Sequence, residues 1–206
     1  MNKTRLEAFS DGVFAIVITL LVLNIHVPDG RTLSLQSLRP LIPPVATFVL
    51  SFIIVGVYWI AHHHMLHFIA QVNRRLLWLN LLLLLSVVFI PFPTSLLATG
   101  FNNPLAVRIY GLNVIATNAS GLFIWLYATS HRELMIPNLS GQFVRTVIVI
   151  HSSPMFVYLL AVVLAGWSTT VSLVLYVAVP LFFILPNPLL ERRIGAATRA
   201  VNANNT

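Results

Sequence analysis

The sequence predicts an all-α integral membrane protein with six transmembrane helices. Of the 206 residues, 58% are hydrophobic and only 8% are charged, whereas charged residues make up about a quarter of an average soluble domain. The mean hydropathy is +0.89, and apolar runs of about 20 residues, long enough to cross a bilayer as helices, recur along the chain. The expected helices span roughly 6–26, 41–69, 74–98, 105–130, 142–166 and 169–189.

The first two helices have recognisable start and stop signals. The first begins with a candidate capping box, Thr4-x-x-Glu7, in which two side chains would satisfy free backbone N–H groups. Residues 28–30 (Pro-Asp-Gly) end it and open a polar connector that reaches Arg39. The second helix starts among residues that lack a backbone N–H, which costs little in a first turn: Pro40, Pro43 and Pro44.

The later helices are separated by turn residues and interrupted by prolines. Pro91 and Pro93 predict a kink or break in the third helix. Residues 102–104 (Asn-Asn-Pro) form a turn before the fourth helix, and residues 137–141 form a loop before the fifth. The sixth helix contains Pro180. We expect one helical domain over 1–190 and a polar basic tail over 191–206.

The distribution of basic residues predicts the orientation in the membrane. Six spans place both termini on one side, and that side holds most of the 12 Lys and Arg residues: Lys3, Arg5, Arg74, Arg75, Arg132, Arg145, Arg192, Arg193 and Arg199. The opposite side holds Arg31, Arg39 and Arg108. By the positive-inside rule, both termini are expected in the cytoplasm of a multi-pass plasma-membrane protein.

Several function classes lack the residues they need. The chain has no cysteine, which excludes disulfides and thiolate chemistry, and its net charge of +7 is scattered over helix ends rather than gathered for nucleic acid. His63 and His67 have the i, i+4 spacing of a metal site, but no acidic residue lies in the histidine run and no HExxH or GxSxG motif is present. We therefore expect no enzyme, metal or cofactor, and leave a pH-sensing role for the histidines open.

The first helix contains a carboxylate that is energetically costly near a membrane. Asp11 lies about two turns into an apolar segment, beside Ser10, and a carboxylate near a bilayer needs partners or water. The alternating topology brings Ser10 and Asp11 to the same depth as His62, His63, His64 and His67 at the end of the second helix, and as Arg74, Arg75, Trp78 and Asn80 at the start of the third. Ser10, Asp11, the four histidines and Asn80 are expected to form a polar layer. The alternative is that Arg5 and Asp11 only reach out to water at the interface.

Farther along the first helix, Ile16, Leu20 and Leu23 recur at i, i+4 and i+7 and share a face, with Thr19 beside them. Such a stripe could contact lipid, the protein core or a pore. The pattern alone does not separate these roles, because the helix is apolar all round.

The string Arg5-x-x-x-Phe9-Ser10-Asp11, continued by residues 14–23 (Phe-Ala-Ile-x-x-Thr-Leu-Leu-Val-Leu), closely resembles the first helix of the lysosomal potassium-channel family (transmembrane protein 175) and its prokaryotic relatives. The stretch 58–68, which begins Tyr-Trp and holds the histidine run, is also similar to that family. One departure is Ala15, where some relatives carry a small hydroxyl residue.

The resemblance implies a potassium-permeable channel, a homotetramer in the lipid bilayer whose pore is lined by the first helix of each subunit without a re-entrant filter loop. No TVGYG-like string occurs here. By resemblance, Ile16 forms the main constriction, Leu20 and Leu23 stack beyond it, and Thr19 lies in the selectivity region. Arg5, Ser10 and Asp11 anchor the helix, joined by Trp59 and either His62 or His63.

Two other functions stay open at this point. The first is a proton- or ion-coupled secondary transporter that uses Asp11 and the histidines of the second helix as its relay. The second is a membrane enzyme in which those histidines hold a metal.

Overall fold

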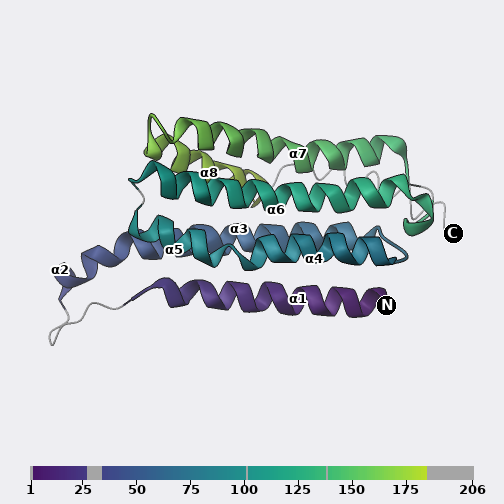
Figure 1. The fold of residues 1–206 in the computed structure, drawn as a ribbon, viewed down its shortest axis with the longest axis horizontal. Helices are drawn as coiled ribbons and strands as arrows, with labels where there is room; N and C mark the ends of the chain where they lie inside the picture. The colour runs from purple at the N-terminus through teal and green to yellow at the C-terminus, as the bar shows by residue number, and fades with distance from the viewer. Residues whose placement is uncertain (1, 27–33, 101, 138, 185–206) are drawn as a thin grey trace.

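The computed structural model describes residues 2–26, 34–100, 102–137 and 139–184, and these residues form a helical bundle (Figure 1). The α-helices are α1 (Lys3–Leu20), α2 (Leu35–Leu38), α3 (Ile42–His67), α4 (Arg74–Val88), α5 (Pro91–Thr99), α6 (Pro104–Ser130), α7 (Gly141–Leu164) and α8 (Thr169–Ile184). Short 3₁₀ turns cover Leu21–Asn24, Arg39–Leu41 and Arg132–Leu134. The expected tail over 191–206 and the residues 28–30 lie outside the described residues.

The all-α membrane prediction is confirmed. Within the described residues, five helical segments are long and apolar enough to cross a membrane, and α8 is shorter at 16 residues. Successive long segments run in alternating directions, so that α3 ends and α4 begins at the end of the bundle where α1 begins (Figure 1). The helix α1 forms one edge of the bundle and packs on α3 and α4. The helix α6 packs between α4 and α7.

The predicted break in the third segment is confirmed at Phe89 and Ile90, between α4 and α5. Pro91 and Pro93 have no N–H to donate to the carbonyls four residues earlier, so the α-helical ladder stops there. The chain continues through turn-type bonds, in which Ile90 N–H donates to the Val87 carbonyl over 3.0 Å. The second half then restarts as a helix with Pro91 in its first turn.

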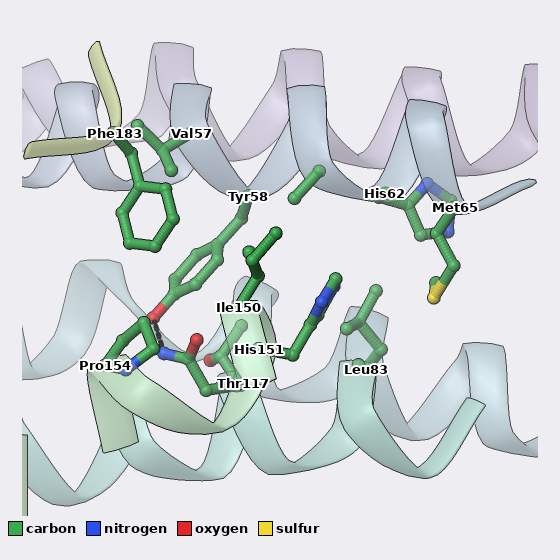
Figure 2. Close-up of a pocket in the computed structure, with 13 residues that line it drawn as sticks. Val57, Tyr58, His62, Met65, Leu83, Thr117, Ile150, His151, Pro154 and Phe183 are labelled. Atoms are coloured by element: carbon green, nitrogen blue, oxygen red, sulfur yellow. Dashed lines mark hydrogen bonds between the residues drawn. The ribbon is translucent and has the colours of Figure 1, made fainter. Parts of the chain in front are cut away.

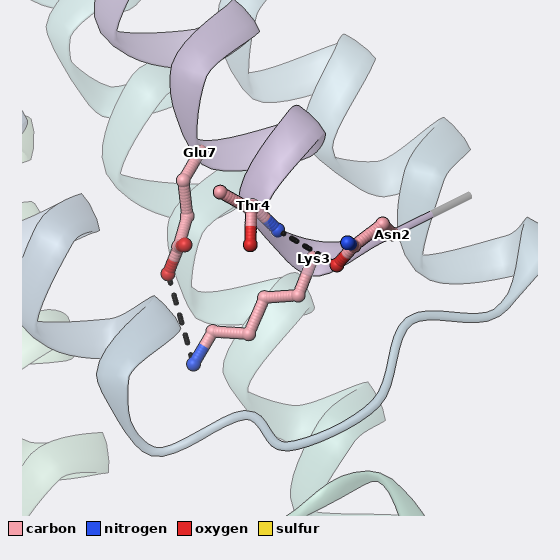
Figure 3. A network of polar contacts seen from close by, with 4 residues as sticks. All are labelled: Asn2, Lys3, Thr4 and Glu7. Atoms are coloured by element: carbon pink, nitrogen blue, oxygen red, sulfur yellow. Dashed lines mark hydrogen bonds and ion pairs between the residues drawn. The ribbon is translucent and has the colours of Figure 1, made fainter.

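The predicted capping box is wrong. The helix α1 begins at Lys3, earlier than expected, and its cap is Asn2, whose Oδ1 accepts from the Thr4 N–H over 3.3 Å (Figure 3). Asn is among the strongest N-cap residues, and it stands two positions before Thr4. Glu7 instead lies 3.6 Å from the Lys3 ammonium, and both side chains are half-buried. An ion pair one helical turn apart adds only about 0.3–0.5 kcal/mol.

Candidate functional site

One face of α1 is packed against the rest of the bundle. Its buried residues are Leu6, Ser10, Phe14 and Val17, followed by Leu21 in the 3₁₀ turn. These positions recur every three or four residues, which brings them onto one side of the helix. The apolar members join a buried cluster with α3, α4 and α6.

The opposite face of α1 is exposed and apolar. Ile16 is 60% exposed and Leu23 is 67% exposed, while Leu20 and Thr19 are exposed beside them. The Thr19 hydroxyl donates to the Ile16 carbonyl over 2.7 Å. This donation uses the proton of Thr19 Oγ1 and leaves the lone pairs of its oxygen free to accept.

A buried hydrogen-bond chain joins α1 to α4 and α3. Asn80 Nδ2 donates to Ser10 Oγ over 3.0 Å, and Asn80 Oδ1 lies 2.8 Å from His62 Nε2. Because an amide oxygen only accepts, His62 Nε2 carries the proton in this arrangement. All three side chains are buried. The ring of Phe14 packs on that of His62, with centroids 5.5 Å apart.

A second, separate contact holds the next residue of α1. Trp59 Nε1 donates to Asp11 Oδ1 over 2.8 Å, at the exposed flank of α1 and α3. His63 contacts the Trp59 ring, with centroids 6.2 Å apart, but forms no hydrogen bond in the described part of the chain. Thus Ser10 and Asp11, adjacent in sequence, bond to different helices.

Arg5 and the exposed residues at the start of α4 stay outside these bonds. Among the described residues, the side chain of Arg5 has no hydrogen bond or ion pair, and it is exposed. Arg74, Arg75 and Trp78 are likewise exposed at the start of α4. In the described ranges, no three His, Asp or Glu side chains gather closely enough to hold a metal ion.

Two contacts of the first helical segment cannot be predicted from residue spacing alone. The amide of Asn24 donates to the Pro91 carbonyl over 3.2 Å and joins the far end of the helix to α5. Phe14 lies against His62. Asn24 is a polar residue at the end of an apolar run, which indicates that its side chain has a partner. That partner, Pro91, comes next to Asn24 only because the chain breaks before α5.

The comparisons with known proteins point to one family. A family model described as the endosomal/lysosomal potassium channel TMEM175 matches residues 5–91, which include α3, α4 and all but the first two residues of α1. A potassium channel of Chryseobacterium sp. (strain P1-3) is 33% identical over 199 residues, covering 94% of this chain and 98% of that protein. A potassium channel of Streptomyces collinus is 38% identical over 152 residues, covering 70% and 74%.

A solved structure is also similar. The crystal structure of a lysosomal potassium-selective channel TMEM175 homolog from Chamaesiphon minutus superposes with a TM-score of 0.77 at 30% identity. The match covers 89% of this chain and 96% of that one.

Proposed function

This chain belongs to the TMEM175 family, and from that premise we propose that it forms a potassium-permeable channel lined by α1. The observation that carries the proposal is the two-sided character of α1. One face is buried against α3 and α4 and bonded to Asn80 of α4, and the other presents Ile16, Leu20 and Leu23 without a partner in the described part of the protomer. One helix cannot enclose a pore, so four copies are proposed to surround it as a homotetramer.

The proposed gate is a hydrophobic constriction. Rings of Ile16 side chains would narrow the pore, with Leu20 and Leu23 stacked beyond them. A narrow apolar constriction expels water and deprives a passing ion of its hydration, so conduction requires the constriction to widen. Tilt or rotation of α1 would supply that widening.

The proposed selectivity element is the ring of Thr19 hydroxyls. Each hydroxyl is oriented by its bond to the Ile16 carbonyl, so its oxygen can face a cation. Four hydroxyls offer fewer oxygen ligands than a carbonyl filter does, and we expect the preference for potassium over sodium to be modest.

The proposed anchor consists of Ser10 and Asp11 with Asn80, His62 and Trp59. By bonding α1 to two helices, it would set the rotation of α1 and hence the face turned to the pore. Arg5 is proposed to bond only in the assembled channel, since it has no partner among the described residues of one protomer. His63 is assigned to packing on Trp59.

The arrangement does not favour the transporter. A relay between Asp11 and a histidine of α3 would need hydrogen-bond continuity between them. Asp11 bonds to Trp59, whereas His62 bonds to Asn80. These are separate sets in the described part of the chain.

Potassium flux into proteoliposomes tests the channel, with wild type compared with Ile16→Asn. A polar side chain should wet the constriction, and we expect flux to rise several-fold. The matched control is Val149→Asn on α7, since Val149 is also branched at Cβ and is 62% exposed against 60% for Ile16. Equal flux in wild type and Ile16→Asn would place Ile16 outside the pore, and uptake of an organic substrate without potassium permeability would refute the function.

A further inference from the structure

A cavity of about 110 Å³, partly open at its mouth, lies between helices of one protomer and away from the exposed face of α1. It is bounded by side chains of α3, α4, α6, α7 and α8, and α1 contributes none of the residues that line it. Figure 2 shows the His151 ring pointing from α7 toward α3, between Tyr58 and Leu83. The cavity is thus separate from the proposed constriction, although His62 of the proposed anchor contributes to its wall.

His151 lies in the middle of a long helix. The helix α7 begins at Gly141 with Ser140 as its cap, so His151 is well inside it. Its side chain is directed into the cavity lining rather than toward a helix end.

The cavity wall offers hydrogen-bond acceptors rather than donors. His151 Nδ1 lies 3.0 Å from the Val147 carbonyl, and a carbonyl only accepts, so Nδ1 carries the proton. In the neutral ring Nε2 is then an acceptor, and it has no partner among the described residues. Asn118 Nδ2 already donates to the Tyr58 hydroxyl and to the Val114 carbonyl, over 2.6 and 3.0 Å. The Tyr58 hydroxyl donates to that same carbonyl.

The size and the apolar character of the lining set the class of ligand. Apart from these groups, the wall consists mainly of apolar side chains such as Met65, Leu83, Ile150 and Phe183. An apolar cavity of about 150 Å³ in another protein takes up benzene, so this volume suits one small ring. An added donor group could bond to the free nitrogen of His151, which accepts in the neutral ring.

We propose that this cavity is a binding site for a small apolar molecule, of the size of a single aromatic ring, that carries one O–H or N–H donor. The ring would lie between α3, α6 and α7, and the donor would bond to His151 Nε2. Phenol is the simplest molecule of this class.

The test uses 4-fluorophenol and fluorobenzene as probes, with ¹⁹F NMR of the detergent-solubilised full-length protein. We expect saturable binding of 4-fluorophenol, about 3- to 10-fold tighter than that of fluorobenzene, as one net hydrogen bond predicts. His151→Phe should reduce the affinity for 4-fluorophenol to that for fluorobenzene. The matched control is His131→Phe, because His131 makes the same bond to a carbonyl four residues earlier, over 2.9 Å, but lies outside the cavity.

A second variant tests the location without removing the acceptor. A Cβ added at Gly121 would come within 3.4 Å of a Leu83 methyl and 4.0 Å of the His151 ring, which is ordinary contact. Gly121→Ala should therefore fold and weaken both probes together by narrowing the cavity. The absence of saturable 4-fluorophenol binding to wild type would overturn the proposal. Equal affinities for the two probes, or binding unchanged in both variants, would overturn it as well.

Discussion

Replacing Asn80 with leucine removes the centre of the buried hydrogen-bond chain that holds α1. The amide of Asn80 donates to Ser10 and accepts from His62, so Asn80→Leu breaks two bonds and leaves both partners unpaired. Hydrogen bonds between membrane helices contribute about 0.6 kcal/mol on average and about 1.7 at most. Two of them predict a loss of about 1–3 kcal/mol in the free energy of unfolding.

Asn113 provides a matched control within the same bundle. Its amide nitrogen donates to the Ser86 carbonyl over 3.0 Å, but its Oδ1 is buried without a hydrogen-bond partner in the described chain. Asn113→Leu loses one bond and also removes an unsatisfied oxygen, and these effects have opposite sign. We expect this variant to be within about 1 kcal/mol of wild type.

The assay is reversible unfolding of the purified protein by sodium dodecyl sulfate in mixed micelles, followed by circular dichroism. All variants are compared at one protein concentration, because subunit association shifts apparent stability. A double-mutant cycle with Ser10→Ala isolates the bond between α1 and α4. If Asn80→Leu were neutral, or if Asn113→Leu cost as much, the chain through Asn80 would not anchor α1.

Three further predictions concern packing, selectivity and orientation. Gly111→Ala should destabilise the fold by about 1–3 kcal/mol through overpacking, because its Cβ would collide with the Tyr176 hydroxyl and Val162. In the same unfolding assay, Gly56→Ala should be neutral or slightly stabilising, because its Cβ meets nothing within 4 Å. Thr19→Val should bring potassium and sodium permeabilities closer together in bi-ionic reversal-potential measurements, with Thr19→Ser as the control that keeps the hydroxyl; an unchanged preference would remove Thr19 from the selectivity region. The chain has no native cysteine, so Asn2→Cys and Asn103→Cys can be tested for labelling in intact cells by a membrane-impermeant maleimide. Only Asn103→Cys should react. Labelling of Asn2→Cys alone would reverse the proposed topology.

The basic residues behind the orientation prediction do not all act in the same way. Arg74 and Arg75 are exposed at the end of the bundle where α1 begins, as charges that face headgroups should be. Arg108, at the other end, donates from Nε to the Val162 carbonyl over 3.3 Å. It thereby satisfies a carbonyl in the last turn of α7, where a cation is favourable. Its place on the less basic side thus has a structural reason.

Local rules account for what could be predicted about the helices. Apolar runs and turn residues are properties of short segments, so they placed the long helices within a few residues of their observed bounds. The break before Pro91 followed from a missing donor, which no tertiary contact can restore. The start of α1 differs from the prediction because two candidate caps, Asn2 and Thr4, stand close together, and both residue types suit that role.

The facing of α1 was not predictable from its sequence. Ile16 and Val17 are adjacent and similarly apolar, yet Ile16 is 60% exposed and Val17 is 1% exposed. In a helix that is apolar all round, no polar face indicates which side turns inward. The contacts with α3 and α4 make that choice, and they depend on residues far away in the chain.

The sequence by itself determined a membrane protein of alternating apolar helices, with its polar groups at one depth, because composition and helix spacing are local. Only the tertiary structure decided that Asn80 joins Ser10 to His62 rather than to His63, and that Asp11 bonds to Trp59. His62 and His63 differ by about 100° around their helix, from 3.6 residues per turn. Which of them faces Asn80 depends on how α3 is rotated in the bundle, and packing between helices sets that rotation.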